Sequence, residues 1–573
     1  MNSSGFKCSA FSFGSTGFLS ERCGAFFKKR GLFPVVLPVF LVLYLPFINK
    51  AFHIDDPLFL WSAEQILSHP LDFYGFMVNW YGWDMPAFEV VKNPPLASYY
   101  IAAAASVFGL QESALHAAFL IPAIVALVGV YRIGGHFARH PGVAALVVAT
   151  SPLFLVSSTT VMCDILAVMF WTWSSAYWLE GIEEGRVGKT VISAFLAALC
   201  ILAKYTGLCL VPLLFIFALT RKRHIKFWLW PLLIPVATSF LYEYGTKMMY
   251  GHGLIFSAAS YAVGINSFDW GKLLPQTIVG LSFLGGTTIT VLFFFPFLWK
   301  RNELIRWGFL FIGLVVLIPL QTKVGDIRLI DEHGVKWPDA TLLSLFVFAG
   351  IHILAVGMLD FWKNRDAYGF LLVAWLFGIF VFACFVNWSI NARSFLPAAP
   401  VVGILLIRRL DREGRLSGQG FPAKVGLLFV LAAALTAWVC FADYKLAGSA
   451  RNAAEYIGEK HGSGEGRIWF QGHWGFQYYM QKEGALALDI QKSRLTPGDV
   501  VVSPCNNSNV HPLNPSVFNL VESIEWFPAR RISTMNHVVG AGFYSDVWGP
   551  FPFFVGVIPP EKYDIHMYTG PAR

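Results

Sequence analysis

Charged residues and cysteines are both scarce in this sequence of 573 residues. Only 14% of the residues are Asp, Glu, Lys or Arg and 56% are hydrophobic, whereas a soluble domain carries about 25% charged residues. So little charge cannot cover the surface of a soluble chain of this length, and a soluble multidomain protein is therefore excluded. The eight cysteines include no C-x-x-C pair, so a zinc or dithiol redox site has no support. The composition predicts an integral membrane protein.

Several signatures of soluble catalysis are also missing. The sequence has no H-E-x-x-H, no Walker A motif, no G-x-S-x-G and no Rossmann G-x-G-x-x-G. Its 43 Lys and Arg outnumber its 35 Asp and Glu, but cytoplasmic loops of membrane proteins are rich in such cations. No nucleic-acid module is present, and we expect membrane lipids rather than a nucleic acid as the surroundings of this chain.

Long apolar runs define the expected membrane topology. A helix needs about 20 apolar residues to cross the hydrocarbon layer, and hydropathy offers fourteen candidate stretches. The Lys and Arg clusters all fall on the inner side only if the stretch 94–110 does not cross. That stretch is short and begins with Pro94-Pro95, which is typical of a helix lying along the interface. The sequence therefore predicts thirteen spans, with the N-terminus inside and the C-terminus outside.

This topology divides the chain into three parts. Residues 1–31 form a cytoplasmic tail, and residues 32–442 form a transmembrane domain with a long first external loop over 51–113. Residues 443–573 form a small extracytoplasmic domain in which helix and strand patterns alternate, which indicates an α/β layer. Its predicted elements are helices over 450–460 and 476–482 and strands over 467–470, 485–490 and 499–502.

Carboxylates at the expected outer face are the first candidates for chemistry, because acidic residues near a bilayer are costly unless they are used. Asp55 and Asp56 directly follow the first span. Two adjacent carboxylates suit a general base with an orienting partner, or a cation site, but Asp before Pro57 also suits a turn or a helix cap. Asp164 lies at the external end of the fourth span. It is either a second functional carboxylate or a helix cap.

Further polar candidates lie at the same face. Lys204 and Arg393 stand at external span ends, where cations either snorkel to the interface or bind the phosphate of a lipid. Glu89 and Lys92 form a pair in the first loop. This pair either binds substrate or is simply a solvated surface pair. The substrate-binding candidates are Glu89, Lys92, Lys204, Tyr205, His252 and Arg393.

Five short segments occur together in a known order. They are Asp55-Asp56, Asn93-Pro94-Pro95-Leu96, Met162-Cys163-Asp164-Ile165, Lys204-Tyr205-Thr206-Gly207 and Arg393-Ser394-Phe395-Leu396-Pro397. Over residues 30–440 the chain thereby resembles the GT-C membrane glycosyltransferases, which include the protein O-mannosyltransferases of glycosyltransferase family 39 and the lipid A aminoarabinose transferases. Two departures, Asp56 in place of Glu and Asn93 in place of His, leave the subfamily open.

The resemblance implies a reaction. A sugar would pass with inversion from a polyprenyl-phosphate-linked donor to a lipid, glycan or protein acceptor at the extracytoplasmic face. The resemblance assigns Asp55 as the base and Asp56 and Asp164 as orienting groups. The departing lipid phosphate would be stabilised by Lys204, Arg393 and Lys92. A divalent cation bridging Asp55 and Asp164 is left open as a cofactor.

Two other functions fit a polytopic membrane protein. A transporter or lipid flippase of envelope glycan precursors would use the carboxylates as proton or coupling-ion sites, but such residues usually lie near mid-membrane. A catalytically inactive subunit of an envelope-polysaccharide complex is the other alternative. The clustering of the candidates at one membrane face favours an interfacial enzyme.

Overall fold

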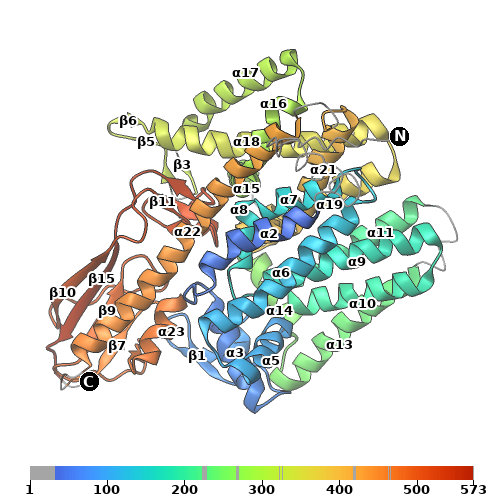
Figure 1. Ribbon diagram of the computed structural model, residues 1–573. Coiled ribbons are helices and arrows are strands. Elements are labelled where there is room, and N and C mark those ends of the chain that lie inside the picture. Colours follow the sequence, from blue (N-terminus) through green and yellow to red (C-terminus); the bar gives the residue numbers. More distant parts are fainter. Residues whose placement is uncertain are drawn as a thin grey trace, which may run out of the picture.

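Helices dominate the computed structural model, and a sheet-bearing region lies at the C-terminal end of the chain (Figure 1). The predicted tail over 1–31 lies outside the residues that the structure describes. The described residues are 33–221, 229–265, 270–321, 323–325, 327–416, 421–462, 464 and 466–571.

The apolar runs of the sequence form the helices of the membrane part, interrupted at prolines and short polar turns. In chain order these helices are α2 (Phe33–Tyr44), α3 (Asp56–Ser68), α4 (Ala87–Val90), α5 (Leu96–Phe108), α6 (Glu112–Gly134), α7 (Pro141–Ala149), α8 (Pro152–Ser158), α9 (Asp164–Glu184), α10 (Val187–Ala203), α11 (Leu210–Thr220), α13 (Leu233–Tyr250), α14 (Leu254–Ile265), α15 (Trp270–Thr287), α16 (Phe295–Leu298), α17 (Arg301–Leu317), α18 (Trp337–Asn364), α19 (Ala367–Val381), α20 (Ala392–Phe395), α21 (Ala399–Arg412) and α22 (Phe421–His461).

The lengths of these helices support an integral membrane protein. Among the described residues, five helices are long and apolar enough to cross a bilayer, or up to seven if each of two bent pairs counts as one span. The bent pairs are α7 with α8, at 64°, and α15 with the helical segment Ile289–Leu298, which ends in α16, at 71°. Several shorter apolar helices accompany them, including α5 over the stretch that we did not expect to cross. The count of thirteen spans and their orientation remain predictions.

Polar and small residues bring neighbouring helices together. Ser174 Oγ donates to the carbonyl of Ser193 at 2.8 Å, and Ser193 Oγ donates back to Ser174 at 2.7 Å, so α9 and α10 run antiparallel in close contact. On α15, a side chain at Gly285 would collide with the backbone of α18 at Gly350. Membrane helices commonly approach in this way, because lipid tails provide no hydrophobic drive for their association.

The C-terminal region contains a mixed sheet of five strands beside the end of α22. The strand order is β10-β15-β9-β7-β8, in which β7 pairs parallel with both β8 and β9 while β15 pairs antiparallel with β9 and β10. Helix α23 (Trp474–Lys482) connects β7 to β8. The strands are β7 (Ile468–Phe470), β8 (Leu486–Ala487), β9 (Val500–Pro504), β10 (Phe518–Trp526) and β15 (Glu561–Tyr568).

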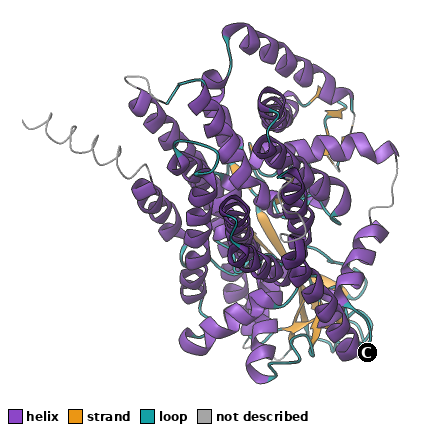
Figure 2. Cartoon of the chain, turned by 90° about the vertical axis from the view of Figure 1, so that its right-hand side faces the viewer, coloured by secondary structure: helices purple, strands orange, loops and turns teal. Residues whose placement is uncertain are grey.

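Short two-stranded ribbons complete the structure, and most strands gather near the C-terminus of the chain (Figure 2). The segment between α3 and α4 and the loop after α17 also carry such ribbons. They are β1 (Met77–Asn79) with β2 (Asp84–Pro86), β3 (Lys323–Val324) with β4 (Ile327–Arg328), β5 (Ile330–Asp331) with β6 (Gly334–Val335), β11 (Ile532–Ser533) with β14 (Phe554–Val555), and β12 (Met535–Asn536) with β13 (Ala541–Gly542).

The sheet-containing C-terminal region agrees with the pattern expected from the sequence. Strands β7 and β9 and helix α23 lie where the alternating pattern predicts them. Helix α22, however, runs without a break from Phe421 to His461, through the expected domain boundary at 442/443. The division into a transmembrane and an extracytoplasmic domain therefore remains a prediction about organisation.

Candidate active site

A cavity of about 330 Å³ lies among residues from widely separated segments. Helix α14 and the residues after α19 supply much of its apolar lining, and the stretch 55–93, the end of α10 and the start of α20 supply polar groups. The polar lining residues are Asp55, Lys92, Asn93, Lys204, Thr206, Asn387, Asn391, Arg393 and Ser394. The apolar and aromatic ones include Leu58, Phe59, Trp80, Tyr81, Val90, Val91, Tyr205, Ile255, Ala258, Ala259, Tyr261, Ala262, Phe382, Val386 and Trp388.

Asp55 occupies the position just before helix α3. The preceding residue, Ile54, has a φ of +50°, which is rare for a β-branched residue. Such backbone strain persists only where surrounding contacts enforce it, and it clusters at functional sites. Asp55 Oδ2 accepts a hydrogen bond from Arg393 Nη2 at 2.9 Å, and its side chain is 29% exposed. This carboxylate is therefore both oriented and accessible from the cavity.

Asp164 and Lys204 meet because α9 and α10 are antiparallel neighbours. Asp164 is the first residue of α9 and Lys204 directly follows α10, so the two side chains come to the same end of the pair. Lys204 Nζ lies 2.5 Å from Asp164 Oδ1, and the Asp164 side chain is only 1% exposed. Buried charges of this kind are stable only when they are paired.

Arg393 connects the two carboxylates. Its Nη2 contacts Asp55, and its Nη1 lies 3.8 Å from Asp164 Oδ2. Helix α20, which carries Arg393, begins at the cap residue Asn391, whose Oδ1 accepts a hydrogen bond from the backbone N–H of Ser394 at 2.9 Å. Four segments spread over more than 300 residues thus place two carboxylates and two cations in one cluster.

Asp56 has a different environment from Asp55. Its Oδ2 accepts from the backbone N–H of His53 and its Oδ1 from that of Val161, both at 2.8 Å, and it is fully buried. Burial raises the pKa of this carboxyl to about 7. Asp56 is not among the residues that line the cavity. Its contacts match the turn interpretation, and they tie the start of α3 to the segment before α9.

The remaining predicted residues divide into two groups. Lys92 and Tyr205 line the cavity, and Lys92 Nζ lies 5.2 Å from the ring centroid of Tyr261. Partial burial lowers the pKa of Lys92. Glu89 and His252 instead lie together outside the lining, with Oε1 and Nε2 3.7 Å apart and more than a third of each side chain exposed.

The cluster does not fit a bridging metal ion. The Arg393 guanidinium contacts Asp55 and Asp164 from between them, where a bridging cation would have to sit. Within the described ranges, no group of three or more His, Cys, Asp or Glu residues is arranged to hold a metal. We therefore derive no step through a divalent cation.

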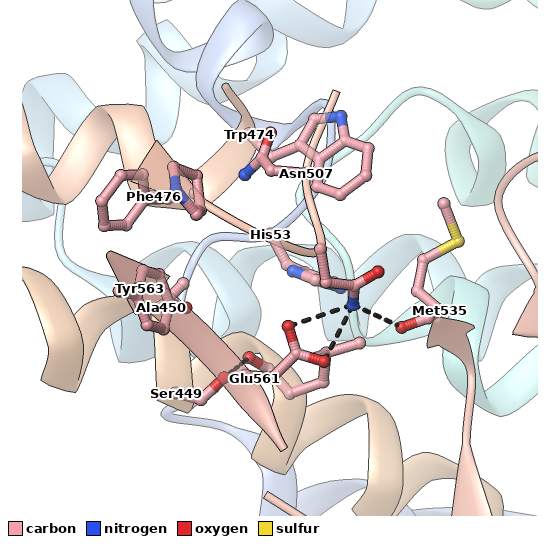
Figure 3. A pocket seen from close by; sticks show the side chains of 13 residues that line it. His53, Ser449, Ala450, Trp474, Phe476, Asn507, Met535, Glu561 and Tyr563 are labelled. Atoms are coloured by element: carbon pink, nitrogen blue, oxygen red, sulfur yellow. Dashed lines mark hydrogen bonds between the residues drawn. The ribbon is translucent and has the colours of Figure 1, made fainter. Parts of the chain in front are cut away.

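A second, smaller cavity of about 30 Å³ has His53 in its wall (Figure 3). The buried Glu561 of β15 lies there, and Asn506 Nδ2 donates to its Oε1 at 2.8 Å. Burial raises the pKa of Glu561 to about 7 and lowers that of His53 to about 4. The space is suited to water-sized molecules, and its lining shares no residue with the larger cavity.

Several lining residues carry no recognisable signal in the sequence. Tyr81, Tyr261 and Trp388 are three aromatics among many in a chain with 53 Phe, 20 Trp and 20 Tyr. Asn391 has a weak signal, because Asn is among the preferred N-cap residues of helices.

The apolar helices indicate a membrane protein. The charged cluster and the cavity form an ionisable site at the ends of these helices. Residues 92–242 match the family model described as dolichyl-phosphate-mannose-protein mannosyltransferase. This match covers Lys92, Asp164, Lys204 and Tyr205, and it confirms the resemblance to GT-C membrane glycosyltransferases that the motifs indicate. No curated protein matches the sequence.

The solved structures that match this chain include those of two proteins. The oligosaccharyltransferase of Archaeoglobus fulgidus, tethered with an acceptor peptide, is 14% identical with a TM-score of 0.46, over 81% of this chain and 64% of that one. Its complex with an inhibitory peptide and a dolichol-phosphate is 15% identical with a TM-score of 0.47, over 83% of this chain and 70% of that one. ArnT from Cupriavidus metallidurans, bound to undecaprenyl phosphate, is 14% identical with a TM-score of 0.40, over 86% of this chain and 94% of that one.

Proposed function

We propose that this protein is an inverting glycosyltransferase that moves a sugar from a polyprenyl-phosphate-linked donor to a lipid, glycan or protein acceptor. The observation that carries the proposal is the Asp55–Arg393–Asp164–Lys204 cluster at the wall of a cavity with an extensive apolar lining. A donor of this class has a phosphate, an apolar chain and a sugar, and the cavity offers a complementary group for each of the first two.

In the proposed reaction Asp55 is the general base. The acceptor hydroxyl attacks the anomeric carbon from the side opposite the lipid phosphate, so the new carbon–oxygen bond forms as the sugar–phosphate bond breaks, and the configuration inverts. The hydroxyl proton passes to the Asp55 carboxylate. A positioned base of this kind contributes about 10²- to 10⁴-fold to the rate.

Arg393 and Lys92 stabilise the leaving phosphate in this scheme. Guanidinium groups bind phosphate in bidentate fashion, and Arg393 lies at the cavity wall next to the base.

Lys204 and Asp164 hold Arg393 in place. Lys204 neutralises one oxygen of Asp164 at 2.5 Å, and the other oxygen faces Arg393. The deep burial of Asp164 keeps it from the acceptor, so its role in the scheme is to orient Arg393. Asp56 does not contact the substrate in this scheme. Its hydrogen bonds stabilise the turn that positions Asp55.

The apolar lining suits the first isoprene units of the donor lipid. Ile255, Ala258, Ala259 and Ala262 lie at helical spacing on one face of α14, and Val386 and Phe382 lie after α19. The proposal also keeps the topology expected from the cation pattern, with the site and residues 443–573 on the extracytoplasmic side.

A transfer assay distinguishes this function from the alternatives. The protein is reconstituted in liposomes with a polyprenyl-phosphate donor that carries a radiolabelled sugar, and membrane glycolipids and proteins serve as acceptors. A transferase cleaves the sugar–phosphate bond and releases polyprenyl phosphate. A carrier moves the intact labelled lipid between leaflets, and an inactive subunit does neither, so either of those results would overturn the proposal.

A further inference from the structure

The segment that carries Arg393 is hydrogen-bonded to the C-terminal region, about 150 residues further along the chain. The N–H of Ala392 donates to the carbonyl of Phe543 at 2.8 Å, and the N–H of Asp546 donates to the carbonyl of Ile390 at 2.8 Å. The Asp546 side chain accepts from the N–H of Ile390 at 2.9 Å. Residues 390–392 therefore depend on residues 543–546 for their backbone hydrogen bonds.

Between these partners, Tyr544 turns its ring toward the cluster. The Arg393 guanidinium carbon lies 5.4 Å from the centroid of the Tyr544 ring, within the range of a cation–π contact. Tyr544 is buried, with 2% exposure, and its hydroxyl donates to Asp443 Oδ2 at 2.8 Å. The hydrogen bond to Asp443 thus fixes the orientation of the ring.

Asp443 connects Tyr544 to the loop that carries the base. Lys50 Nζ lies 2.5 Å from Asp443 Oδ2, and Thr534 Oγ1 donates to Asp443 Oδ1 at 2.7 Å. Both charged side chains are completely buried. Lys50 precedes Asp55 by five residues, so one carboxylate fixes both the loop before Asp55 and the tyrosine beside Arg393.

Helix α23 holds the same loop from another direction. The Tyr479 hydroxyl accepts from the N–H of Phe52 at 2.8 Å. At Gly475 a side chain would collide with the carbonyl of Phe52, so the helix and the loop approach at backbone distance. The ring of His53 also meets Tyr544 edge to face, with centroids 5.6 Å apart.

We infer that the C-terminal region completes the active site, and that Tyr544 is a positioning residue that holds Arg393 for the donor phosphate. This inference rests on the proposed function and adds a named residue outside the motifs and outside the family match over residues 92–242. The flat ring face attracts the guanidinium and limits its rotation, which reduces the freedom it must lose when it binds phosphate. The hydroxyl-to-Asp443 bond keeps the ring in place.

A double-mutant cycle on the full chain in detergent micelles tests the inference, with undecaprenyl phosphate as the binding probe. We expect Tyr544→Leu to weaken probe binding about 5- to 30-fold, the range of a buried cation–π contact. In an Arg393→Ala background the same change should alter binding less than about 2-fold, because Tyr544 acts through Arg393. Tyr544→Phe keeps the ring and should stay within about 3-fold of the wild type.

The control is Tyr563→Phe, which removes another buried tyrosine hydroxyl of the C-terminal region that lies at the smaller cavity. It should leave probe binding unchanged. If Tyr544→Leu does not elute as a folded monodisperse protein, Tyr544→Met, whose unbranched and flexible side chain fills irregular space, takes its place in the cycle.

The outcomes separate the inference from the function on which it rests. If Arg393→Ala itself leaves undecaprenyl phosphate binding unchanged, the lipid-phosphate site of the proposed function is wrong. If Arg393→Ala weakens binding but Tyr544→Leu does not, the positioning role of Tyr544 is overturned. An equal loss from Tyr544→Leu in both backgrounds overturns it as well, because the effect then does not pass through Arg393.

Discussion

The ion pair between Lys204 and Asp164 gives a quantitative prediction about how the cluster is held. Lys204→Met removes the ammonium group 2.5 Å from a carboxylate that is 1% exposed, and Arg393 remains only at 3.8 Å. Breaking a buried pair by deleting one partner costs about 3–5 kcal/mol, because the other charge stays buried. We expect a loss near the lower end, about 3 kcal/mol, because Arg393 still offsets part of the Asp164 charge.

The assay is reversible unfolding in mixed detergent micelles, followed by tryptophan fluorescence. In an Asp164→Asn background Lys204→Met should cost less than about 1 kcal/mol, because no buried charge is left unpaired. The matched control is Lys189→Met near the start of α10, whose partner Glu180 lies at 2.6 Å. Glu180 also accepts hydrogen bonds from Arg132 Nε and Nη2, so it stays paired, and we expect a loss of about 0–1 kcal/mol. The reasoning is refuted if Lys204→Met costs no more than Lys189→Met, or if its cost persists with Asp164→Asn.

Three further results are expected. Because burial raises the pKa of Asp56 from 3.8 to about 7, the stability that this group contributes is complete below about pH 4 and is lost as the pH rises to about 7. Asp56→Asn should therefore reduce the decrease in Tm between about pH 4 and pH 7. If the Tm of Asp56→Asn falls as steeply over this range as that of the control Asp331→Asn, the raised pKa of Asp56 is contradicted. Arg393→Lys should raise the KM for the donor about 10-fold or more in the transfer assay, because Lys cannot bind phosphate in bidentate fashion; an unchanged KM argues against that contact. Gly285→Leu should destabilise the protein by more than 2 kcal/mol, on the order of a severe overpacking change, whereas Gly378→Leu, at an open position, should be tolerated.

Local sequence was sufficient for part of the site. Asp164 and Lys204 stand at the start of one helix and just after the end of the next, and antiparallel neighbours necessarily bring such ends together. The proximity of Asp55 to Arg393 could not be worked out locally, since 338 residues separate them. Only the order of the family-like motifs pointed to it.

Other features were beyond the reach of the sequence. Asp55 and Asp56 are adjacent and chemically almost equivalent in sequence, and only the packing of Val161 against the loop decides which of them is buried. The same holds for Tyr544, whose contacts with Arg393 and Asp443 are set by tertiary folding and have no local pattern.

The fold shows the same division between local and distant information. Periodicity predicted β7, β9 and α23 because each has a local signal, but the pairing of β15 with both β9 and β10 depends on residues distant in sequence. The long helix α22 crosses the expected boundary, and Asp443 at that boundary is paired with Lys50 inside the protein. Hydropathy alone cannot anticipate that contact.

Turnover of the donor by Asp55→Asn protein tests the central claim most directly. Wild-type protein and the variant are saturated with the polyprenyl-phosphate sugar, and release of free polyprenyl phosphate is followed together with sugar transfer, with Asp331→Asn as the control. The account predicts that Asp55→Asn still binds the donor but turns over at least about 100-fold more slowly, the contribution of a positioned base. Turnover of Asp55→Asn at the rate of Asp331→Asn would contradict it.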